Sequence, residues 1–249
     1  MLLLLQNISF TFPGKNHLLN NVSLTFEENK IYALMGANGS GKTTLFNLLT
    51  GFIEPQSGEI IFRNENITHR APYKINSKGI GRTFQDLRLI TKLSVKENIL
   101  LAMQNNPSDS WLNALLPENF HRKSNEELEK RANKIIAQFF LSDVKNSLAA
   151  EISYGQQKLL TLACCMANGA EILLLDEPVA GINPEYRNKV AQLLKQLRKE
   201  RKTVLLIEHN TDFISEVADH LFFLNEGKMY SYENLEKLKT DPLVMEAYI

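Results

Sequence analysis

Residues 36–43 read GANGSGKT and have the residue types that bind a polyphosphate. The segment fits the spacing G-x-x-x-x-G-K-[ST] and lies between the apolar stretch IYALM and the helix-like stretch TTLFNLL. Its glycines let several backbone N–H groups point inward at phosphate oxygens, and the following helix adds partial positive charge. A glycine-rich turn that binds nothing is disfavoured by the flanking strand and helix.

Within this loop, we expect Lys42 to reach the β- and γ-phosphates of a nucleotide and the Thr43 hydroxyl to bind Mg²⁺. The residues expected to bind the nucleotide are Gly36, Asn38, Gly39, Ser40, Gly41, Lys42, Thr43 and Thr44.

Two acidic residues end the apolar stretch of residues 172–178, ILLLDEP. A carboxylate at Asp176 is placed to contact Mg²⁺ through water, as the second aspartate of P-loop proteins does. Successive side chains of an extended chain diverge, so Glu177 can face a water molecule while Asp176 serves the metal. Glu177 is therefore a candidate general base. Taken alone it would as readily be a solvated acid at a strand end.

His209 closes the stretch TVLLIEH, and Gln85 follows GIGRTF. Ligands of parallel sheets bind outside the carboxyl ends of the strands, so Gly36, Asp176 and His209 are expected at one edge. We place Gln85 there too, because an uncharged amide can orient water or contact Mg²⁺. The alternatives are a surface histidine and an ordinary loop glutamine.

A polar cluster, SYGQQ at residues 153–157, precedes the helix-like run KLLTLACC. It contains no acid, histidine or lysine, so by itself it performs no acid–base or nucleophilic chemistry. The residues alone predict a helix cap with Ser153 at the N-cap.

The elements that must position these residues follow from the apolar pattern. Strands are expected at LLLLQNISFTF, NVSLTF, KIYALMG and EIIFR, with a helix after Gly41 that carries Leu45, Leu48 and Leu49 on one face. From residue 171 the pattern alternates between the strands EILLLD, TVLLIE and HLFFLN and the helices PEYRNKVAQLLKQLRKE and TDFISEVAD. Such alternation predicts a parallel sheet with crossover helices.

Residues 94–149 are charged and helix-forming, with breaks near residues 105–109 and at Pro117. This segment predicts a helical insertion into the α/β core.

Composition narrows the class of protein. The chain has 249 residues, 44% of them hydrophobic, and a formal net charge of +0, which argues against nucleic acid as the main partner. The apolar start lacks a basic flank and a cleavage site, and no apolar run approaches the ~18 residues of a membrane span. We expect a cytoplasmic protein. Cys164 and Cys165 have no metal-site spacing and are expected to be small buried residues.

Together these motifs resemble the ATP-binding subunit of ABC transporters over essentially the whole chain. The resemblance implies an α/β fold of the P-loop NTPase class, with a RecA-like parallel-sheet core, an N-terminal antiparallel β subdomain and an inserted α-helical subdomain. It places one nucleotide-binding domain over residues 1–249, with the core at 1–85 and 160–249 and the helical subdomain at 86–159.

In this family, Ile152–Gln156 takes the place of the signature motif LSGGQ. The resemblance implies that Ser153, Gly155 and Gln156 close over ATP held by the P-loop of a second subunit, in a head-to-tail dimer with two shared ATP sites. Ser153 can cap the helix and also contact the partner's ATP, so the two interpretations are compatible.

By the same resemblance, Phe12 takes the place of the aromatic residue that stacks on adenine, the alternative being core packing of the first strand. Asn183 replaces an aspartate that the family usually has in a loop touching the partner. Glu177 would activate water, His209 would steady the γ-phosphate, and Lys42 with Mg²⁺ would offset developing charge.

The segments GIGRTFQ, SYGQQ, AGINP and PLVMEAYI look like those of the ATPase subunits of branched-chain amino-acid importers and their amide and urea relatives. This implies ATP and Mg²⁺ as cofactors and a second ATPase subunit, identical or paralogous, as partner. Two integral membrane permeases would dock at a groove between the Gln85 loop and the helical insertion, which puts the chain on the inner face of the cell membrane. A periplasmic or surface solute-binding protein would act indirectly.

Three other functions share some of these features. The motor of a lipid or lipopolysaccharide exporter would carry nearly identical motifs. A nucleotide-gated scaffold in DNA repair or ribosome rescue is disfavoured by the absence of a long coiled coil or second cassette and by the charge balance. A GTPase or small-molecule kinase is disfavoured because the sequence has no N-K-x-D motif.

Overall fold

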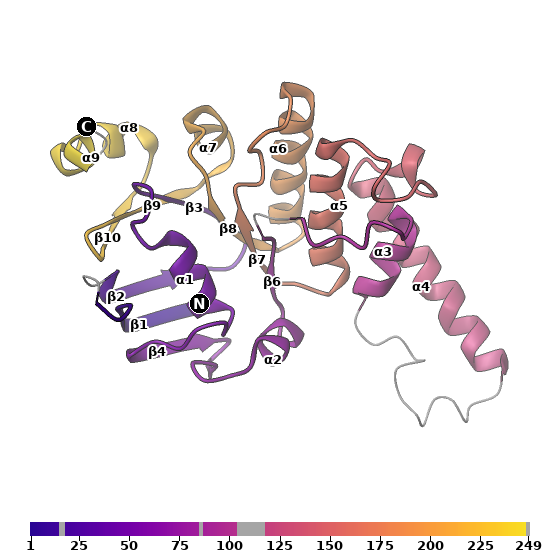
Figure 1. Ribbon diagram of the computed structural model, residues 1–249, viewed down its shortest axis with the longest axis horizontal. Coiled ribbons are helices and arrows are strands. Elements are labelled where there is room, and N and C mark those ends of the chain that lie inside the picture. The colour runs from indigo at the N-terminus through magenta and orange to yellow at the C-terminus, as the bar shows by residue number, and fades with distance from the viewer. Residues whose placement is uncertain (15–17, 85–86, 104–117, 248–249) are drawn as a thin grey trace.

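The computed structural model describes residues 1–14, 18–84, 87–103 and 118–247, and of residues 118–125 only the backbone. Two sheets organise the described chain (Figure 1). The first has four strands in the order β2-β1-β4-β5, all antiparallel. Its strands are β1 (Leu3–Phe10), β2 (Leu19–Phe26), β4 (Ser57–Phe62) and β5 (Glu65–Asn66).

The second sheet has six strands in the order β10-β9-β3-β8-β7-β6. All neighbouring pairs are parallel except β9 and β10, which form an antiparallel hairpin. Its strands are β3 (Ile31–Met35), β6 (Ile80–Arg82), β7 (Ile172–Asp176), β8 (Thr203–Ile207), β9 (His220–Asn225) and β10 (Lys228–Tyr232). The expected parallel sheet and N-terminal antiparallel sheet are therefore both present.

The hairpin strand β10 was not among the strands expected from the sequence. Its turn consists of Glu226 and Gly227, which both have positive φ, 48° and 75°. This is the geometry of a two-residue turn whose twist matches that of the flanking strands.

The central strands are buried on both faces, which is why they are continuous apolar runs. Alternate residues contribute to two different cores. In β3, Tyr32 and Leu34 pack with the four-stranded sheet and helix α1, whereas Ile31, Ala33 and Met35 pack with the helices on the opposite face. Helix α1 therefore lies between the two sheets, as Figure 1 shows.

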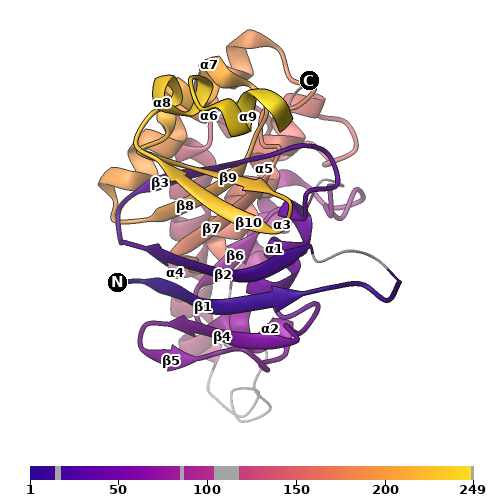
Figure 2. The ribbon, with the colours of Figure 1, turned by 90° about the vertical axis from the view of Figure 1, so that its left-hand side faces the viewer.

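Helices cover the other face and extend the molecule to one side. Figure 1 shows α6 and α7 over the parallel sheet and the group α5, α3 and α4 beside them, and Figure 2 shows α8 and α9 beyond the edge strand β10. The helices are α1 (Lys42–Leu49), α2 (Pro72–Ser77), α3 (Val95–Ala102), α4 (Glu118–Gln138), the 3-10 turn η3 (Ser142–Val144), α5 (Tyr154–Ala167), α6 (Pro184–Lys199), α7 (Thr211–Val217), α8 (Leu235–Lys239) and α9 (Pro242–Ala247).

The helical insertion expected between the two halves of the core corresponds to α3, α4 and the first part of α5. The boundary drawn from the sequence between residues 159 and 160 falls inside α5, which is one continuous helix. This helix packs against α3 and α4 on one side and against α6 and β6 on the other. It therefore joins the insertion rigidly to the core.

Both cysteines lie on α5 and are free thiols. Burial raises the pKa of Cys164 and of Cys165 to about 12, so both are protonated and unreactive near neutral pH. Among the helices of the described chain, none has the length and apolar character needed to cross a membrane.

Candidate functional site

The loop of residues 36–41 connects the end of β3 to the start of α1, at the carboxyl edge of the parallel sheet. Gly36 has a φ of 147°, and a Cβ atom there would clash with the carbonyl oxygen of Leu224 in β9. Only glycine lets the loop lie this close to the neighbouring strand. The loop therefore curls at the C-terminal edge of the sheet as the sequence predicts, and Lys42 begins the helix behind it.

Lys42 is 7% exposed and donates hydrogen bonds from Nζ to the carbonyl oxygens of Gly36 at 2.7 Å and Ala37 at 2.9 Å. Burial lowers the pKa of its ammonium, because a charge in a poorly solvated place is disfavoured. Among the described residues, the buried hydroxyl of Ser40 has no hydrogen-bond partner. An anionic ligand in the loop would supply partners for both groups, which fits a polyphosphate.

Asp176 is the last residue of β7 and is 6% exposed. Its carboxylate oxygen Oδ2 lies 3.9 Å from the Arg82 guanidinium, and its backbone N–H donates to the hydroxyl of Thr83 at 3.2 Å. Burial raises the pKa of Asp176, and the positive charge of Arg82 opposes this shift. The carboxylate thus lies under the influence of the positive charges of Arg82 and Lys42.

Arg82 is held in turn by several groups. Its guanidinium donates to the Asn47 side-chain oxygen at 2.6 Å and to the Thr50 hydroxyl at 3.2 Å, and lies over the rings of Phe46 and Phe84. Arg82 lies within the segment GIGRTFQ, but no role was predicted for it from the sequence, because its partners lie far away in the chain.

Oxygen donors that suit Mg²⁺ are present at this edge. The Thr43 side chain is exposed at the start of α1, and the Asp176 carboxylate lies at the end of β7. Mg²⁺ prefers oxygen ligands and is commonly bound through one or two protein groups together with substrate phosphates. In the part of the chain that the structure describes, no cluster of three His, Cys, Asp or Glu residues forms a protein-only metal cage. The residues fit a metal held jointly with a nucleotide.

Glu177 and His209 come from neighbouring strands and meet above the sheet edge. Oε1 of Glu177 lies 3.7 Å from Nε2 of His209, and the two side chains are 29% and 39% exposed. Glu177 has a φ of 48°, and its N–H donates to the carbonyl of Ile207 at 3.0 Å. The structure therefore brings these two predicted residues together at a place that a substrate can reach.

Glu208 is a second residue that the sequence reasoning missed. It is buried, and its carboxylate accepts hydrogen bonds from the N–H groups of Val179 at 2.9 Å, His209 at 3.1 Å and Asn210 at 3.4 Å. The side chain ties the loop after β7 to the loop after β8, which carry Glu177 and His209. An acid directly after the apolar run TVLLI was the available signal.

The turn of residues 153–156 begins α5. Ser153 is the N-cap: its hydroxyl accepts from the N–H of Gln156 at 3.3 Å, and the Gln156 side chain accepts from the N–H of Ser153 at 2.9 Å. The predicted helix cap is confirmed, as a reciprocal capping box. Ser153 and Tyr154 are exposed, so the tip of the helix faces outward.

Two tyrosine–glycine contacts fasten this turn to the loop that follows the Glu177 strand and to the first turn of α6. The Tyr186 ring packs directly on Gly155: a Cβ atom added to this glycine would lie 2.6 Å from the ring. A Cβ atom added to Gly181 would lie 3.3 Å from the Tyr154 ring. The Ser153 hydroxyl also donates to the Tyr186 hydroxyl at 3.4 Å. The turn and this loop therefore form one packed unit.

Asn183 lies in the same loop, at the position where the sequence departs from the family's aspartate. Its side chain accepts a hydrogen bond from the N–H of Tyr186 at 3.0 Å and caps α6. The cap holds Tyr186 where it covers Gly155.

Phe12 follows the end of β1 and is 37% exposed, whereas Phe10 is buried and packs edge-on against it at 4.9 Å between ring centroids. Core packing at this strand end is thus done by Phe10. Leu18, which pairs with Phe10, has its carbonyl oxygen 3.1 Å from where a Cβ on Gly41 would lie. The strand end that carries Phe12 therefore borders the phosphate loop, and its stacking role stays a prediction.

Gln85 lies outside the described residues. The residues before it are described: the N–H of Thr83 donates to the carbonyl of Leu174 at 2.9 Å, and its hydroxyl accepts from Asp176. The chain thus leaves β6 beside Asp176.

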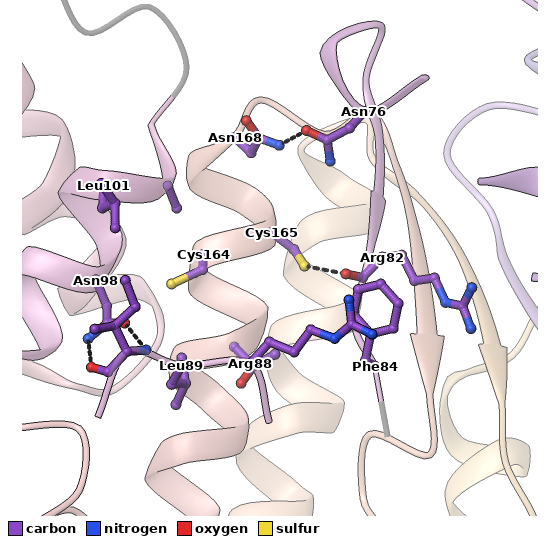
Figure 3. Close-up of a pocket in the computed structure, with 13 residues that line it drawn as sticks. Asn76, Arg82, Phe84, Arg88, Leu89, Asn98, Leu101, Cys164, Cys165 and Asn168 are labelled. Carbon is purple, nitrogen blue, oxygen red and sulfur yellow. Dashed lines mark hydrogen bonds between the residues drawn. The ribbon is translucent and has the colours of Figure 1, made fainter. Parts of the chain in front are cut away.

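A groove of about 410 Å³ lies between the segment after β6 and the helices α3 and α5 (Figure 3). Phe84 and Arg88 form one wall, with the guanidinium 3.5 Å from the ring centroid, and Leu101 on α3 is largely exposed. Asn98 closes the floor by donating to the carbonyls of Ile90 at 3.1 Å and Leu93 at 3.2 Å. A docking groove was expected from the sequence between the Gln85 loop and the helical insertion; because Gln85 lies outside the described residues, that assignment stays a prediction.

The family model described as ABC transporter matches residues 19–180. The high-affinity branched-chain amino acid transport ATP-binding protein BraF of Pseudomonas aeruginosa is 36% identical over 232 residues, which are 93% of this chain and 91% of that protein. The protein LivG of Escherichia coli, which carries the same description, is 34% identical over 232 residues with the same coverage. The probable branched-chain amino acid transport ATP-binding protein LivG of Archaeoglobus fulgidus is 32% identical over 251 residues, which cover 98% of this chain and 93% of that protein.

Solved structures agree with this match. A nucleotide-free ATP-binding cassette from an ABC transporter has a TM-score of 0.84 and 32% sequence identity, and covers 100% of this chain and 98% of that one. An ADP conformation of an ATP-binding cassette has a TM-score of 0.84 and 31% identity, with 99% and 98% coverage. The fold expected from the sequence is therefore confirmed.

The contact between Gly155 and Tyr186 gives a stability prediction. Glycine to alanine within a helix ordinarily stabilises by roughly 0.5–1 kcal/mol. At Gly155 the added methyl meets the Tyr186 ring, so we expect Gly155→Ala to lower the free energy of unfolding by about 1–3 kcal/mol. The double variant with Tyr186→Ala should lose less than the sum of the two single losses. Denaturant unfolding measures this; additive losses, or a stabilising Gly155→Ala, would contradict the packing.

Proposed function

Because the chain belongs to the ABC transporter family of ATP-binding cassettes, we propose that it is the ATP-hydrolysing subunit of an importer of branched-chain amino acids. One observation carries this most directly: strands β3, β7 and β8 bring the phosphate loop, Asp176, Glu177 and His209 to one sheet edge. The near-full-length similarity to branched-chain amino acid transport ATP-binding proteins supports the choice of solute. It also favours import over the exporter weighed from the sequence.

The nucleotide binds at the phosphate loop in this proposal. The backbone of residues 36–41 and the hydroxyl of Ser40 surround the phosphates, Lys42 turns from its loop carbonyls to the β- and γ-phosphates, and Phe12 stacks on the base. A planar, partly exposed ring at the loop border suits such stacking. Thr43, Asp176 and Gln85 would hold Mg²⁺ jointly with the nucleotide, and the ion would supply charge neutralisation at the γ-phosphate.

Glu177 acts as the general base that takes a proton from the attacking water. The Nε2 atom of His209 lies 3.7 Å from the Glu177 carboxylate, and in this proposal the imidazole contacts the γ-phosphate. Proton transfer to a positioned base contributes typically ~10²–10⁴-fold to a rate. Lys42 and the surrounding positive charge stabilise the charge that develops on the phosphoryl oxygens.

A second ATPase subunit completes each site. The exposed tip of α5, with Ser153, Gly155 and Gln156, offers a hydroxyl and backbone N–H groups at the positive end of a 14-residue helix. In this proposal these groups do not bind the chain's own nucleotide. They close over the ATP that is bound to the phosphate loop of the partner. The partner is an identical or paralogous cassette arranged head to tail.

The membrane subunits dock on the groove between α3, α5 and the segment after β6. Its exposed apolar side chain Leu101 and the cationic Arg88 suit a short amphipathic permease helix. The chain therefore works at the inner face of the membrane, and a periplasmic or surface solute-binding protein delivers the solute from the other side.

Replacing the proposed base separates nucleotide binding from hydrolysis. We expect Glu177→Gln to lower ATP turnover by at least ~100-fold while ATP still drives dimerisation, because the amide keeps the shape but accepts no proton. Turnover is measured by phosphate release and dimerisation by light scattering. The control Glu216→Gln, on the exposed face of α7, should behave like the parent. Parental turnover by Glu177→Gln would remove Glu177 from this role.

The shared site is tested by Ser153→Asp. Aspartate is as good an N-cap as serine, so α5 keeps its cap, but a carboxylate now faces the partner's γ-phosphate. We expect unchanged thermal stability and ATP binding by the single chain, with loss of ATP-driven dimerisation and hydrolysis. Asn234→Asp, the equivalent change at the N-cap of α8, is the control. A Ser153→Asp chain that still dimerises on ATP would argue against a shared site.

The solute is tested by purifying the chain with its membrane subunits from native membrane. After reconstitution into vesicles, we expect ATP-dependent accumulation of labelled leucine, isoleucine or valine. Short amides and urea are the competing solutes to assay beside them. Co-purification with subunits that export lipid would overturn the import assignment.

A further inference from the structure

A buried lysine lies directly behind the catalytic edge and has no part in the function described so far. Lys158 is on α5, five residues after the N-cap Ser153, and is 6% exposed. Its Nζ donates a hydrogen bond to the backbone carbonyl oxygen of Glu177 at 3.1 Å. The side chain lines the same small buried cavity as Asp176 and Thr83. Its positive charge also lowers the pKa of Asp176, against the larger effect of burial and alongside that of Arg82.

Burying an ammonium is costly unless it is paired or hydrogen-bonded. If Lys158 only filled space, an apolar side chain would pack at this position more favourably, because it would avoid the free-energy cost of burying a charge. The residue it binds is also unusual: Glu177 has a φ of 48°, a left-handed conformation that costs a non-glycine residue about 1 kcal/mol or more. Such a conformation persists only where neighbouring groups hold it.

The contacts of Glu177 show what holds it. Its N–H donates to the Ile207 carbonyl at 3.0 Å, and its own carbonyl accepts from the N–H of Ala180 at 3.2 Å and from Lys158. The first two bonds lie within the sheet edge and its loop. The bond from Lys158 alone among these three comes from the helix that carries the exposed turn of residues 153–156.

We propose that Lys158 is a positioning residue for ATP hydrolysis: its ammonium holds the Glu177 carbonyl and so fixes the direction of the Glu177 carboxylate in the same subunit. The proposal rests on the proposed function. It also links the first turn of α5 to the middle of the same helix. Ser153 and Lys158 are about 7–8 Å apart along one rigid helix, so a tilt of the turn against a partner's nucleotide moves the group that holds the subunit's own base.

The test compares two lysines that each donate to a backbone carbonyl. Lys158→Met removes the bond to Glu177 and keeps side-chain length, whereas Lys202→Met removes the bond from Lys202 to the Ala170 carbonyl, 2.7 Å long and at the opposite end of β7. We expect Lys158→Met to lower kcat for ATP on the order of 10- to 100-fold, with KM and the Kd for ATP unchanged, because a misdirected base slows chemistry without weakening binding. Lys202→Met should keep the parental kcat. Lys158→Arg, which retains charge and N–H donors, should recover most of the loss.

A second measurement tests whether Lys158→Met lowers hydrolysis by disturbing the turn of residues 153–156 instead of by releasing Glu177. In a Glu177→Gln background, Lys158→Met should leave ATP-driven dimerisation intact, because Ser153 keeps its own capping bonds. Lost dimerisation, a parallel fall in ATP affinity, an equal loss in Lys202→Met, or no recovery in Lys158→Arg would each overturn the inference. If the parent chain hydrolyses ATP and Lys158→Met matches it, this inference alone fails; if the parent chain hydrolyses none, the proposed function fails first.

Discussion

The burial of one carboxylate among cations is the interaction on which the site depends. Asp176 ends a strand that is buried on both faces, and Arg82 and Lys42 are buried beside it. Each of these charges is disfavoured by its loss of water, as the raised pKa of Asp176 and the lowered pKa values of Lys42 and Arg82 indicate. Their mutual attraction offsets part of that cost. The two cations beside this carboxylate also suit the binding of a negatively charged nucleotide.

The loops that carry Glu177 and His209 are held in place by neighbouring side chains. Glu208 ties the loop of Glu177 to that of His209, and Tyr186 and Tyr154 fasten the start of α5 to the loop before α6. Loops are usually the mobile part of a fold. Here, buried hydrogen bonds and ring-on-glycine packing restrict them, so that groups from three segments keep a common geometry before a ligand arrives.

Helix α5 belongs both to the helical insertion and to the α/β core. Its first turn is exposed and capped, its middle donates from Lys158 to the Glu177 carbonyl, and its far end packs on β6 through Cys165 and Arg82. A helix transmits displacement along its axis because each turn is bonded to the next. The outward-facing turn and the sheet edge that carries Glu177 are therefore mechanically joined within one subunit.

The sequence by itself determined the phosphate loop, the acidic strand end and the alternation of strands and helices, because these depend on local spacing and on apolar runs. It also predicted the Ser153 cap, which is a matter of four consecutive residues. Only the tertiary structure revealed Arg82, Glu208 and Lys158, whose partners lie 94, 29 and 19 residues away in Asp176, Val179 and Glu177. It also showed that α5 runs through residue 159 without a break, so one helix is shared by the helical region and the core. A motif records what one segment can do, whereas the support of a catalytic group comes from whichever distant side chain the packed core places against it.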